Sequence, residues 1–257
     1  CAALCLKSGN ASILRGGKEA FHSNTALAKI VRDALRETNF PADAVLLVPT
    51  TDREALKHLL KLDELIHCII PRGGEALIRF VAEHSRIPVI KHYKGVCNLY
   101  VDSEADLELA RKITINAKCQ RPGVCNAIEN LIVHQDAASD FLPAVATELQ
   151  ANGVELRVDE RSRTELQLST GANGLKQATE EDYHEEFLDL VLAVKVVDSL
   201  DKAIEQVNLY GSGHSDAIVT SNETTAERFL DAVDTSTAYW NASTRFTDGF
   251  EFGLGAE

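Results

Sequence analysis

Short apolar runs alternate along this 257-residue chain with longer segments whose apolar residues recur at helical spacing. The runs AVLLVP, NLYVD, AIENLIVH and LVLAVKVV have the length and composition of buried strands. The segment from about His22 to Glu37 has the period of an amphipathic helix. Repeated strand–helix alternation is typical of parallel strands that are covered by helices. The sequence therefore predicts an α/β fold.

The length allows two α/β lobes, and we expect the boundary between them near residue 116. The expected domains are residues 1–116 and residues 117–257. The polar stretch 158–180 is the expected surface excursion. Because ligand sites favour junctions between lobes, the segment AKCQRPGVCNA at residues 117–127 is a candidate site.

Charge and hydropathy restrict the partners of this chain. Its formal net charge of −13 would repel phosphate backbones, so we expect no nucleic-acid partner. No apolar run approaches the roughly 20 residues of a membrane span, so we expect no membrane insertion. An anionic small-molecule substrate would need a local positive pocket on this negative surface.

Cysteine spacing argues against a metal centre, because the chain has no CxxC pair and no His/Cys cluster at zinc spacing. The six cysteines are too sparse for a disulfide scaffold, which favours a reduced, cytoplasmic setting. Cys5, Cys68 and Cys97 stand in apolar runs and are expected to be buried. The chain begins at Cys1 and contains no methionine, so we expect it to be a piece of a longer protein.

Two predicted strand-to-helix turns are rich in glycine and carry cationic side chains. They comprise Arg15, Gly16, Gly17 and Lys18 in the first turn, and Arg72, Gly73 and Gly74 in the second. Glycine lets the backbone approach a ligand, and the helix that follows offers free N–H groups to an anion. Neither turn matches GxGxxG or a Walker motif, so a phosphate-bearing cofactor and a simple strand ending both remain open.

Cys119 and Cys125 flank an Arg-Pro-Gly turn. Zinc is disfavoured because a second ligand pair is missing, and a disulfide would be unusual in a reducing compartment. Cys125 is expected at a tight turn that exposes its side chain, with Lys118 and Arg121 near enough in sequence to favour a thiolate. These residues alone leave both a structural cysteine and a nucleophile open.

The segment YWNASTRFTDG at residues 239–249 is denser in small polar groups than an ordinary loop requires. Its arginine can bind a carboxylate or a phosphate with two hydrogen bonds. The candidate substrate-binding residues are Asn241, Ser243, Thr244 and Arg245. An ordinary polar loop is the alternative.

Four blocks, KSGNASILRGGKEAFHSN, IIPRGG, NAKCQRPGVCNAIE and NASTRFTDG, closely resemble the gamma-glutamyl phosphate reductases of the aldehyde dehydrogenase superfamily. The resemblance covers essentially the whole chain. It implies a Rossmann-type NADP(H)-binding domain at residues 1–116 and an α/β catalytic domain at residues 117–257. It also implies NADPH-dependent reduction of L-glutamyl 5-phosphate to glutamate 5-semialdehyde in proline biosynthesis, with Cys125 as the nucleophile that forms a thioester.

The same resemblance assigns cofactor contacts. It implies that the 15–18 turn holds the adenosine ribose, where Arg15 and Lys18 would attract a 2′-phosphate and favour NADPH. It implies that the 72–74 turn meets the pyrophosphate and that Glu186 contacts the nicotinamide-side ribose. A homo-oligomer and a glutamate 5-kinase partner are further implications.

Two departures bear on mechanism. Where aldehyde-oxidising relatives carry a glutamate base, this chain has Lys91, His92 and Tyr93, which favours reduction over hydrolysis of the thioester. The oxyanion-stabilising asparagine of the family would lie upstream of Cys1. Alternatives are therefore an aldehyde-oxidising dehydrogenase of the same superfamily and a catalytically incomplete binding module.

Overall fold

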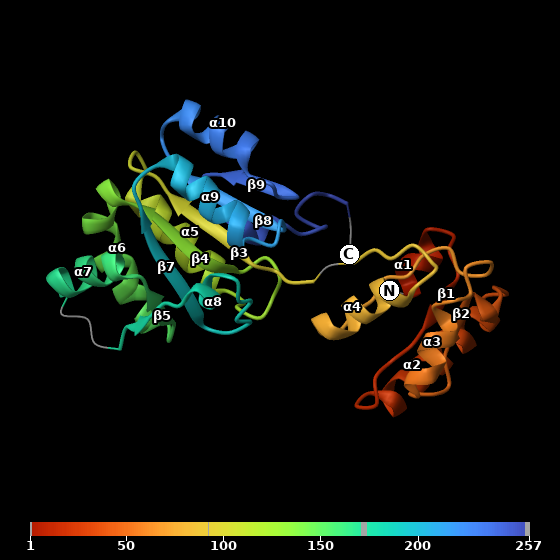
Figure 1. Ribbon diagram of the computed structural model, residues 1–257. Coiled ribbons are helices and arrows are strands. Elements are labelled where there is room, and N and C mark those ends of the chain that lie inside the picture. Colours follow the sequence, from red (N-terminus) through yellow and green to blue (C-terminus); the bar gives the residue numbers. More distant parts are fainter. Residues whose placement is uncertain (1, 92, 171–173, 255–257) are drawn as a thin grey trace. The chain divides into compact units, whose positions relative to one another are not determined.

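The structure is a computed structural model that describes residues 2–91, 93–170 and 174–254 (Figure 1). The chain divides into two compact units, Cys1–His92 with Leu254–Glu257, and Tyr93–Gly253. Within the described residues, no helix is both long enough and apolar enough to cross a membrane.

The first unit is built on two short parallel strands and their helices. Ser12 of the first strand pairs with Val45 of the second, and one further parallel bridge joins Ile69 to Val89. In chain order the elements are α1 (Ala2–Lys7), β1 (Ser12–Leu14), α2 (Phe21–Glu37), the 3₁₀ turn η1 (Ala42–Ala44), β2 (Val45–Leu47), α3 (Arg53–Leu59) and α4 (Glu75–His84).

The segment LIHCII does not form the buried strand that its apolar composition suggests. It contributes a single bridge at Ile69, so its side chains are not enclosed between a sheet and covering helices. As a result Cys68 is exposed, and the prediction that it is buried is wrong. Cys97 is fully buried as predicted, and Cys5 is partly buried.

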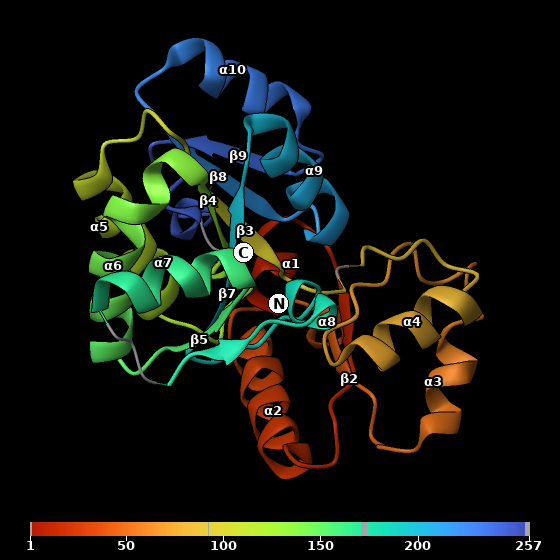
Figure 2. The same cartoon turned by 60° about the vertical axis from the view of Figure 1, so that its left-hand side comes forward.

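The second unit contains, within the described residues, a seven-stranded parallel sheet of order β6-β5-β7-β4-β3-β8-β9. Figure 2 shows α5, α6 and α7 on one face of this sheet and α9 and α10 on the other. The strands are β3 (Cys97–Val101), β4 (Ile128–His134), β5 (Glu155–Val158), β6 (Lys176–Gln177), β7 (Val191–Val197), β8 (Ser215–Val219) and β9 (Thr237–Trp240). The helices are α5 (Leu107–Cys119), α6 (Gln135–Ala151), α7 (Glu160–Thr170), α8 (Glu180–Tyr183), α9 (Leu200–Tyr210) and α10 (Glu223–Ala232), followed by the 3₁₀ turn η2 (Thr244–Phe246).

The division of the chain into compact units falls between residues 92 and 93, whereas the predicted boundary near residue 116 falls inside α5. The reason is strand pairing. The run NLYVD forms β3, and β3 lies between β4 and β8 in the second sheet, so the helix that follows must cover that same sheet. Alternation of elements along the sequence predicts the strands but not the sheet that each one joins.

The stretch 158–180 is more structured than the predicted excursion. It contains α7 and β6, and Ser162 and Leu166 are buried within it, while residues 171–173 lie outside the described residues.

A side-chain cap begins the helix that precedes the cysteine segment. The Asp106 carboxylate accepts hydrogen bonds from the N–H groups of Glu108 and Leu109 at the start of α5. This helix ends at Cys119, and the chain then turns into β4.

Candidate active site

Four segments that lead into neighbouring strands of the second unit carry the residues of the candidate active site. Gly95 precedes β3, Cys125 precedes β4, Glu186 precedes β7 and His214 precedes β8. Because β7, β4, β3 and β8 are adjacent and parallel, these segments lie along the same edge of the sheet, at the amino ends of the strands. Ligands of open α/β sheets more often bind at the carboxyl ends.

Cys125 is exposed on a turn, as predicted from the Arg-Pro-Gly sequence. The N–H of Ala127 donates to the carbonyl of Val124 across this turn, just before β4 begins. Cys119 and Cys125 are both thiols and form no disulfide. Cys119 packs partly buried against the main core, and burial raises the pKa of its thiol, which suits a packing role.

Gly95 allows a close approach that brings three parts of the site together. A Cβ at this position would lie 2.5 Å from the carbonyl oxygen of Cys125, 2.7 Å from its Cα and 2.7 Å from Oε1 of Glu186. No side chain fits there without moving backbone, so only glycine lets this segment pass across the turn. The Glu186 carboxylate and the Cys125 backbone therefore both lie close to Gly95.

The thiol of Cys97 makes a hydrogen bond to the backbone of the Cys125 turn. The Sγ of Cys97, fully buried at the start of β3, donates to the carbonyl of Cys125 over 3.2 Å. Burial raises the pKa of this thiol well above its usual value, so it stays a donor. His214 Nδ1 lies 3.8 Å from the same sulfur and 2.9 Å from Oγ of Ser215, which in turn contacts Oγ1 of Thr247 at 2.6 Å.

The C-terminal segment folds back onto the residue after the nucleophile candidate. The Asn126 side-chain amide donates to the carbonyl of Thr247 over 2.8 Å, and the Thr244 hydroxyl donates to the carbonyl of Asn126 over 2.7 Å. The Arg245 guanidinium donates to the Asn126 side-chain oxygen and to Oε1 of Gln120, the latter over 3.1 Å. Long-range contacts thus place Arg245 beside the Cys125 turn.

Two of the four predicted substrate-binding side chains, Ser243 and Thr244, make hydrogen bonds that hold the loop. Ser243 accepts a hydrogen bond from the N–H of Arg245, and Thr244 is fully buried against Asn126. Asn241 is separate, because its amide pairs with the N–H and carbonyl of Thr220, at the carboxyl end of β8. Arg245 is the member of this set that is partly exposed and charged. Burial lowers the pKa of its guanidinium, with a smaller contribution from the charge of Arg121, while the charge of Cys125 acts in the opposite direction.

Lys118, which was expected near Cys125, is paired with a buried carboxylate. It is fully buried, and its Nζ donates to Oε2 of Glu129 over 2.6 Å, with both side chains 0 % exposed. Burial lowers the pKa of Lys118 and raises that of Glu129 to about 7. This pair is not predictable from the sequence pattern, because nothing in the helical pattern of α5 marks a lysine that points inward. The i to i+11 spacing across a turn is the one available signal.

The predicted cofactor turns both lie in the first unit. The 15–18 turn follows β1, and the Arg15 guanidinium donates to the carbonyls of Thr51 and Asp52 over 3.1 and 3.3 Å. A Cβ at Gly16 would meet the end of the Asn24 side chain, which would have to move aside. In the second turn Gly73 has a φ of 155° and Gly74 caps the start of α4.

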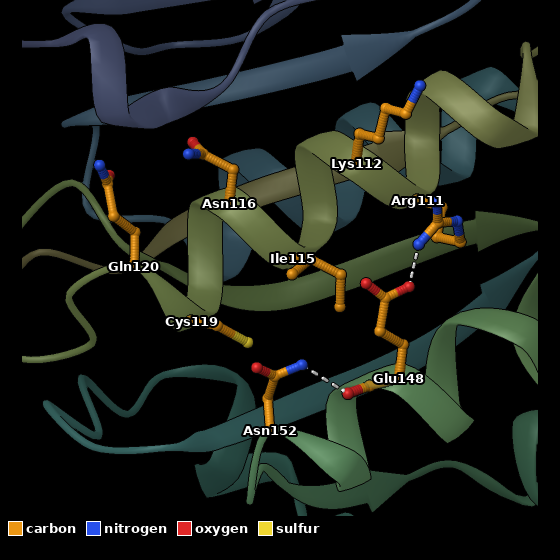
Figure 3. A pocket seen from close by; sticks show the side chains of 8 residues that line it. All are labelled: Arg111, Lys112, Ile115, Asn116, Cys119, Gln120, Glu148 and Asn152. Carbon is orange, nitrogen blue, oxygen red and sulfur yellow. Dashed lines mark hydrogen bonds and ion pairs between the residues drawn. The ribbon is translucent and has the colours of Figure 1, made fainter.

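A surface pocket of about 490 Å³ lies elsewhere, between α5 and the end of α6 (Figure 3). Its lining residues are Arg111, Lys112, Ile115, Asn116, Cys119, Gln120, Glu148 and Asn152. The Arg111 guanidinium donates to the Glu148 carboxylate, and the thiol present is that of Cys119. The pocket therefore gives Cys119 access to reagents but does not contain Cys125.

Among the described residues, no group of three or more His, Cys, Asp or Glu side chains is arranged to hold a metal ion.

A sequence profile of the aldehyde dehydrogenase family matches residues 1–172 and 175–254. The match covers nearly the whole sequence, and the parallel sheets with their covering helices agree with it. The chain belongs to the aldehyde dehydrogenase family.

Within that family the chain is similar to gamma-glutamyl phosphate reductases. It is 61% identical to that of Opitutus terrae, over 100% of this chain and 60% of the relative. The crystal structure of the Thermotoga maritima enzyme superposes with a TM-score of 0.93 at 44% identity, over 99% of this chain and 60% of that one. A glyceraldehyde-3-phosphate dehydrogenase of Methanocaldococcus jannaschii, complexed with NADP, shares the fold at 18% identity and a TM-score of 0.71, over 93% of this chain and 60% of that one. The chain thus spans about 60% of the length of these relatives.

Proposed function

We propose that the protein containing this chain reduces L-glutamyl 5-phosphate to L-glutamate 5-semialdehyde with NADPH and releases phosphate, as a step of proline biosynthesis. The observation that carries the proposal is the exposed Cys125 thiol beside the Arg245 guanidinium at one sheet edge. The similarity to gamma-glutamyl phosphate reductases supports the choice of substrate.

In the proposed reaction the Cys125 Sγ attacks the acyl carbon, the bond to phosphate breaks, and a thioester forms on the cysteine. A nicotinamide cofactor, when bound, would supply a hydride to the carbon of this thioester, and a proton from solvent would complete the hemithioacetal. The resulting hemithioacetal collapses to the aldehyde and returns the thiol of Cys125. Cys97 holds the carbonyl of Cys125 through its buried S–H, and so keeps the turn in place during both steps.

Arg245 supplies the positive charge that a phosphate or carboxylate needs on a chain with a net charge of −13. Its guanidinium is already oriented by Asn126 and Gln120, so little side-chain freedom is lost when an anion binds. Phosphate is a good leaving group. The segment that crosses the Cys125 turn at Gly95 carries no carboxylate, which suits a thioester that is reduced and not hydrolysed.

The residues of the first unit fit a nicotinamide cofactor in position and backbone chemistry. The 15–18 turn follows a parallel strand at its carboxyl end, where nucleotides commonly bind, and Gly16 places the Asn24 side chain close to the backbone of the turn. Lys18 would attract the 2′-phosphate of NADPH, whereas Arg15 is engaged by the carbonyls of Thr51 and Asp52 and orients the turn. Glu186 is proposed to bind the nicotinamide-side ribose.

The 72–74 turn is proposed to approach the pyrophosphate. Gly73 adopts a backbone conformation that other residues avoid, and Gly74 begins α4 with no side chain in the way. In this proposal the protein is cytoplasmic, forms a homo-oligomer and receives its unstable acyl phosphate from a glutamate 5-kinase.

An aldehyde-oxidising dehydrogenase is the second candidate, because one observation favours it. The Glu186 carboxylate approaches the Cys125 turn at Gly95, where a carboxylate would be suited to activate water for hydrolysis of the thioester.

One experiment separates the two candidates. The full-length protein is given glutamate 5-semialdehyde and NADP⁺, with and without phosphate, and the absorbance of the reduced cofactor is followed. Turnover that requires both phosphate and Cys125, as judged with Cys125→Ala, supports the reductase. Turnover without phosphate supports the oxidising dehydrogenase, and the absence of turnover from a folded protein contradicts both.

A further inference from the structure

The turn that carries Cys125 is closed at its base by a buried ion pair. Lys118 is in the last turn of α5 and Glu129 is the second residue of β4, so the pair joins the two ends of the segment that holds the nucleophile. Both side chains are 0 % exposed. Neither touches solvent, so the pair cannot act on substrate directly.

The second oxygen of Glu129 reaches another part of the site. Its Oε1 accepts a hydrogen bond from the N–H of Leu188 over 3.4 Å, while Oε2 holds Lys118. Leu188 is two residues beyond Glu186, in the segment that leads to β7. One buried carboxylate therefore contacts both the base of the Cys125 turn and the Glu186 segment.

Leu188 needs such a partner because its backbone is in the left-handed region, with a φ of 55°. A branched side chain disfavours this conformation, so surrounding contacts must maintain it. The carbonyl of Leu188 faces Gly123 of the Cys125 turn, where a Cβ would lie 3.4 Å away. The N–H side of Leu188 is held by Glu129 and its carbonyl side lies against the turn.

We infer that Glu129, held by Lys118, is a positioning residue that fixes the Glu186 segment against the Cys125 turn. This deepens the proposed function, since it assumes that Cys125 and Glu186 both serve the reaction. The Glu186 carboxylate and the Cys125 backbone also both lie against Gly95. Loss of the anchor at Leu188 should change their relative position without removing either group.

Two double variants of the full-length protein isolate this role. Lys118→Met with Glu129→Met removes the ion pair and leaves no acceptor for Leu188. Lys118→Met with Glu129→Gln also removes the ion pair but keeps a side-chain oxygen that Leu188 can reach. Replacing both partners of a buried pair with uncharged groups of similar length avoids an unpaired buried charge, so both variants should fold.

The variants are compared by kcat and KM separately, by hydrogen exchange over residues 184–190, and by urea unfolding. The double-methionine variant should exchange faster over residues 184–190 and lose about 10²-fold in kcat, as expected for a misplacement near 1 Å. The glutamine variant should restore slow exchange and at least about tenfold of that kcat. Glu148→Gln, which removes an outward carboxylate paired with α5, is the matched control and should behave as the unchanged protein.

A double-methionine variant with unchanged kcat and unchanged exchange would overturn the inference. So would a glutamine variant that falls as far as the double-methionine one at equal stability. If the unchanged protein shows no reductase turnover, the proposed function fails, while hydrogen exchange still decides whether Glu129 anchors Leu188.

Discussion

Gly95→Ala tests the contact on which the candidate active site depends. The added methyl group would lie 2.5 Å from the carbonyl oxygen of Cys125 and 2.7 Å from its Cα. Both neighbours are backbone, so neither can turn aside as a flexible side chain would. An ordinary contact begins at 3.4 Å, so the Cys125 backbone must retreat by about 0.9 Å from its present 2.5 Å.

Displacement of the Cys125 backbone should lower both the stability of the protein and its catalytic rate. Overpacking a close contact destabilises a protein by about 1–3 kcal/mol. A displacement near 1 Å at the reacting group costs about 10²-fold in rate. We therefore expect kcat to fall about 10²-fold, and the urea midpoint to fall by an amount equivalent to about 1–3 kcal/mol.

The assay is the phosphate-dependent oxidation of glutamate 5-semialdehyde by the full-length protein with NADP⁺. Gly123→Ala is the comparison, since a methyl group there would lie 3.4 Å from the carbonyl of Leu188, an ordinary contact within the same turn. It should lose far less activity than Gly95→Ala. Wild-type kcat and stability in Gly95→Ala would refute the reasoning, because the turn would then be free to move without consequence.

Three further perturbations have expected outcomes. Arg245→Gln removes the charge beside Cys125 and should raise the KM for the acyl phosphate about tenfold to a hundredfold, and an unchanged KM in steady-state kinetics would count against Arg245 as the anion site. Burial raises the pKa of Asp216 from 3.8 to about 6, so its contribution to stability is complete below pH 3.8 and is lost as the pH rises through 6. That loss amounts to about 3 kcal/mol, and urea unfolding of Asp216→Asn at several pH values should lack it, whereas an equal slope in both proteins would contradict the assignment. Asp106→Ala removes the cap of α5 and should cost about 1 kcal/mol in the same assay, with no effect if the cap is redundant.

Local pattern was sufficient for much of the fold. Alternation of apolar and helical segments predicted the strands and helices around Cys125, and the Arg-Pro-Gly sequence predicted its exposed turn, because these features depend on a few neighbouring residues. The boundary at residue 116 was wrong because strand pairing, not local pattern, assigns β3 to the second sheet.

The site residues that escaped prediction all depend on contacts between distant segments. Glu129 and Lys118 look like ordinary surface charges in sequence, and only folding places them opposite each other in the interior. Asn241 was predicted to bind substrate, and the structure shows its amide paired with the N–H and the carbonyl of Thr220. The sequence does not mark Gly95 as a site residue, because its role depends on the Cys125 backbone and the Glu186 carboxylate that pack against it.

The position of Cys125 at the amino ends of parallel strands has an electrostatic consequence. Helices between parallel strands run in the opposite direction, so α5 and α9 end at this edge, with the partial negative charge of their carboxyl termini. Under the proposed function, an anionic substrate would approach against that field, and we expect Arg245 to supply the opposing potential. This edge of the sheet thus disfavours an anion unless a cation such as Arg245 offsets the helix ends.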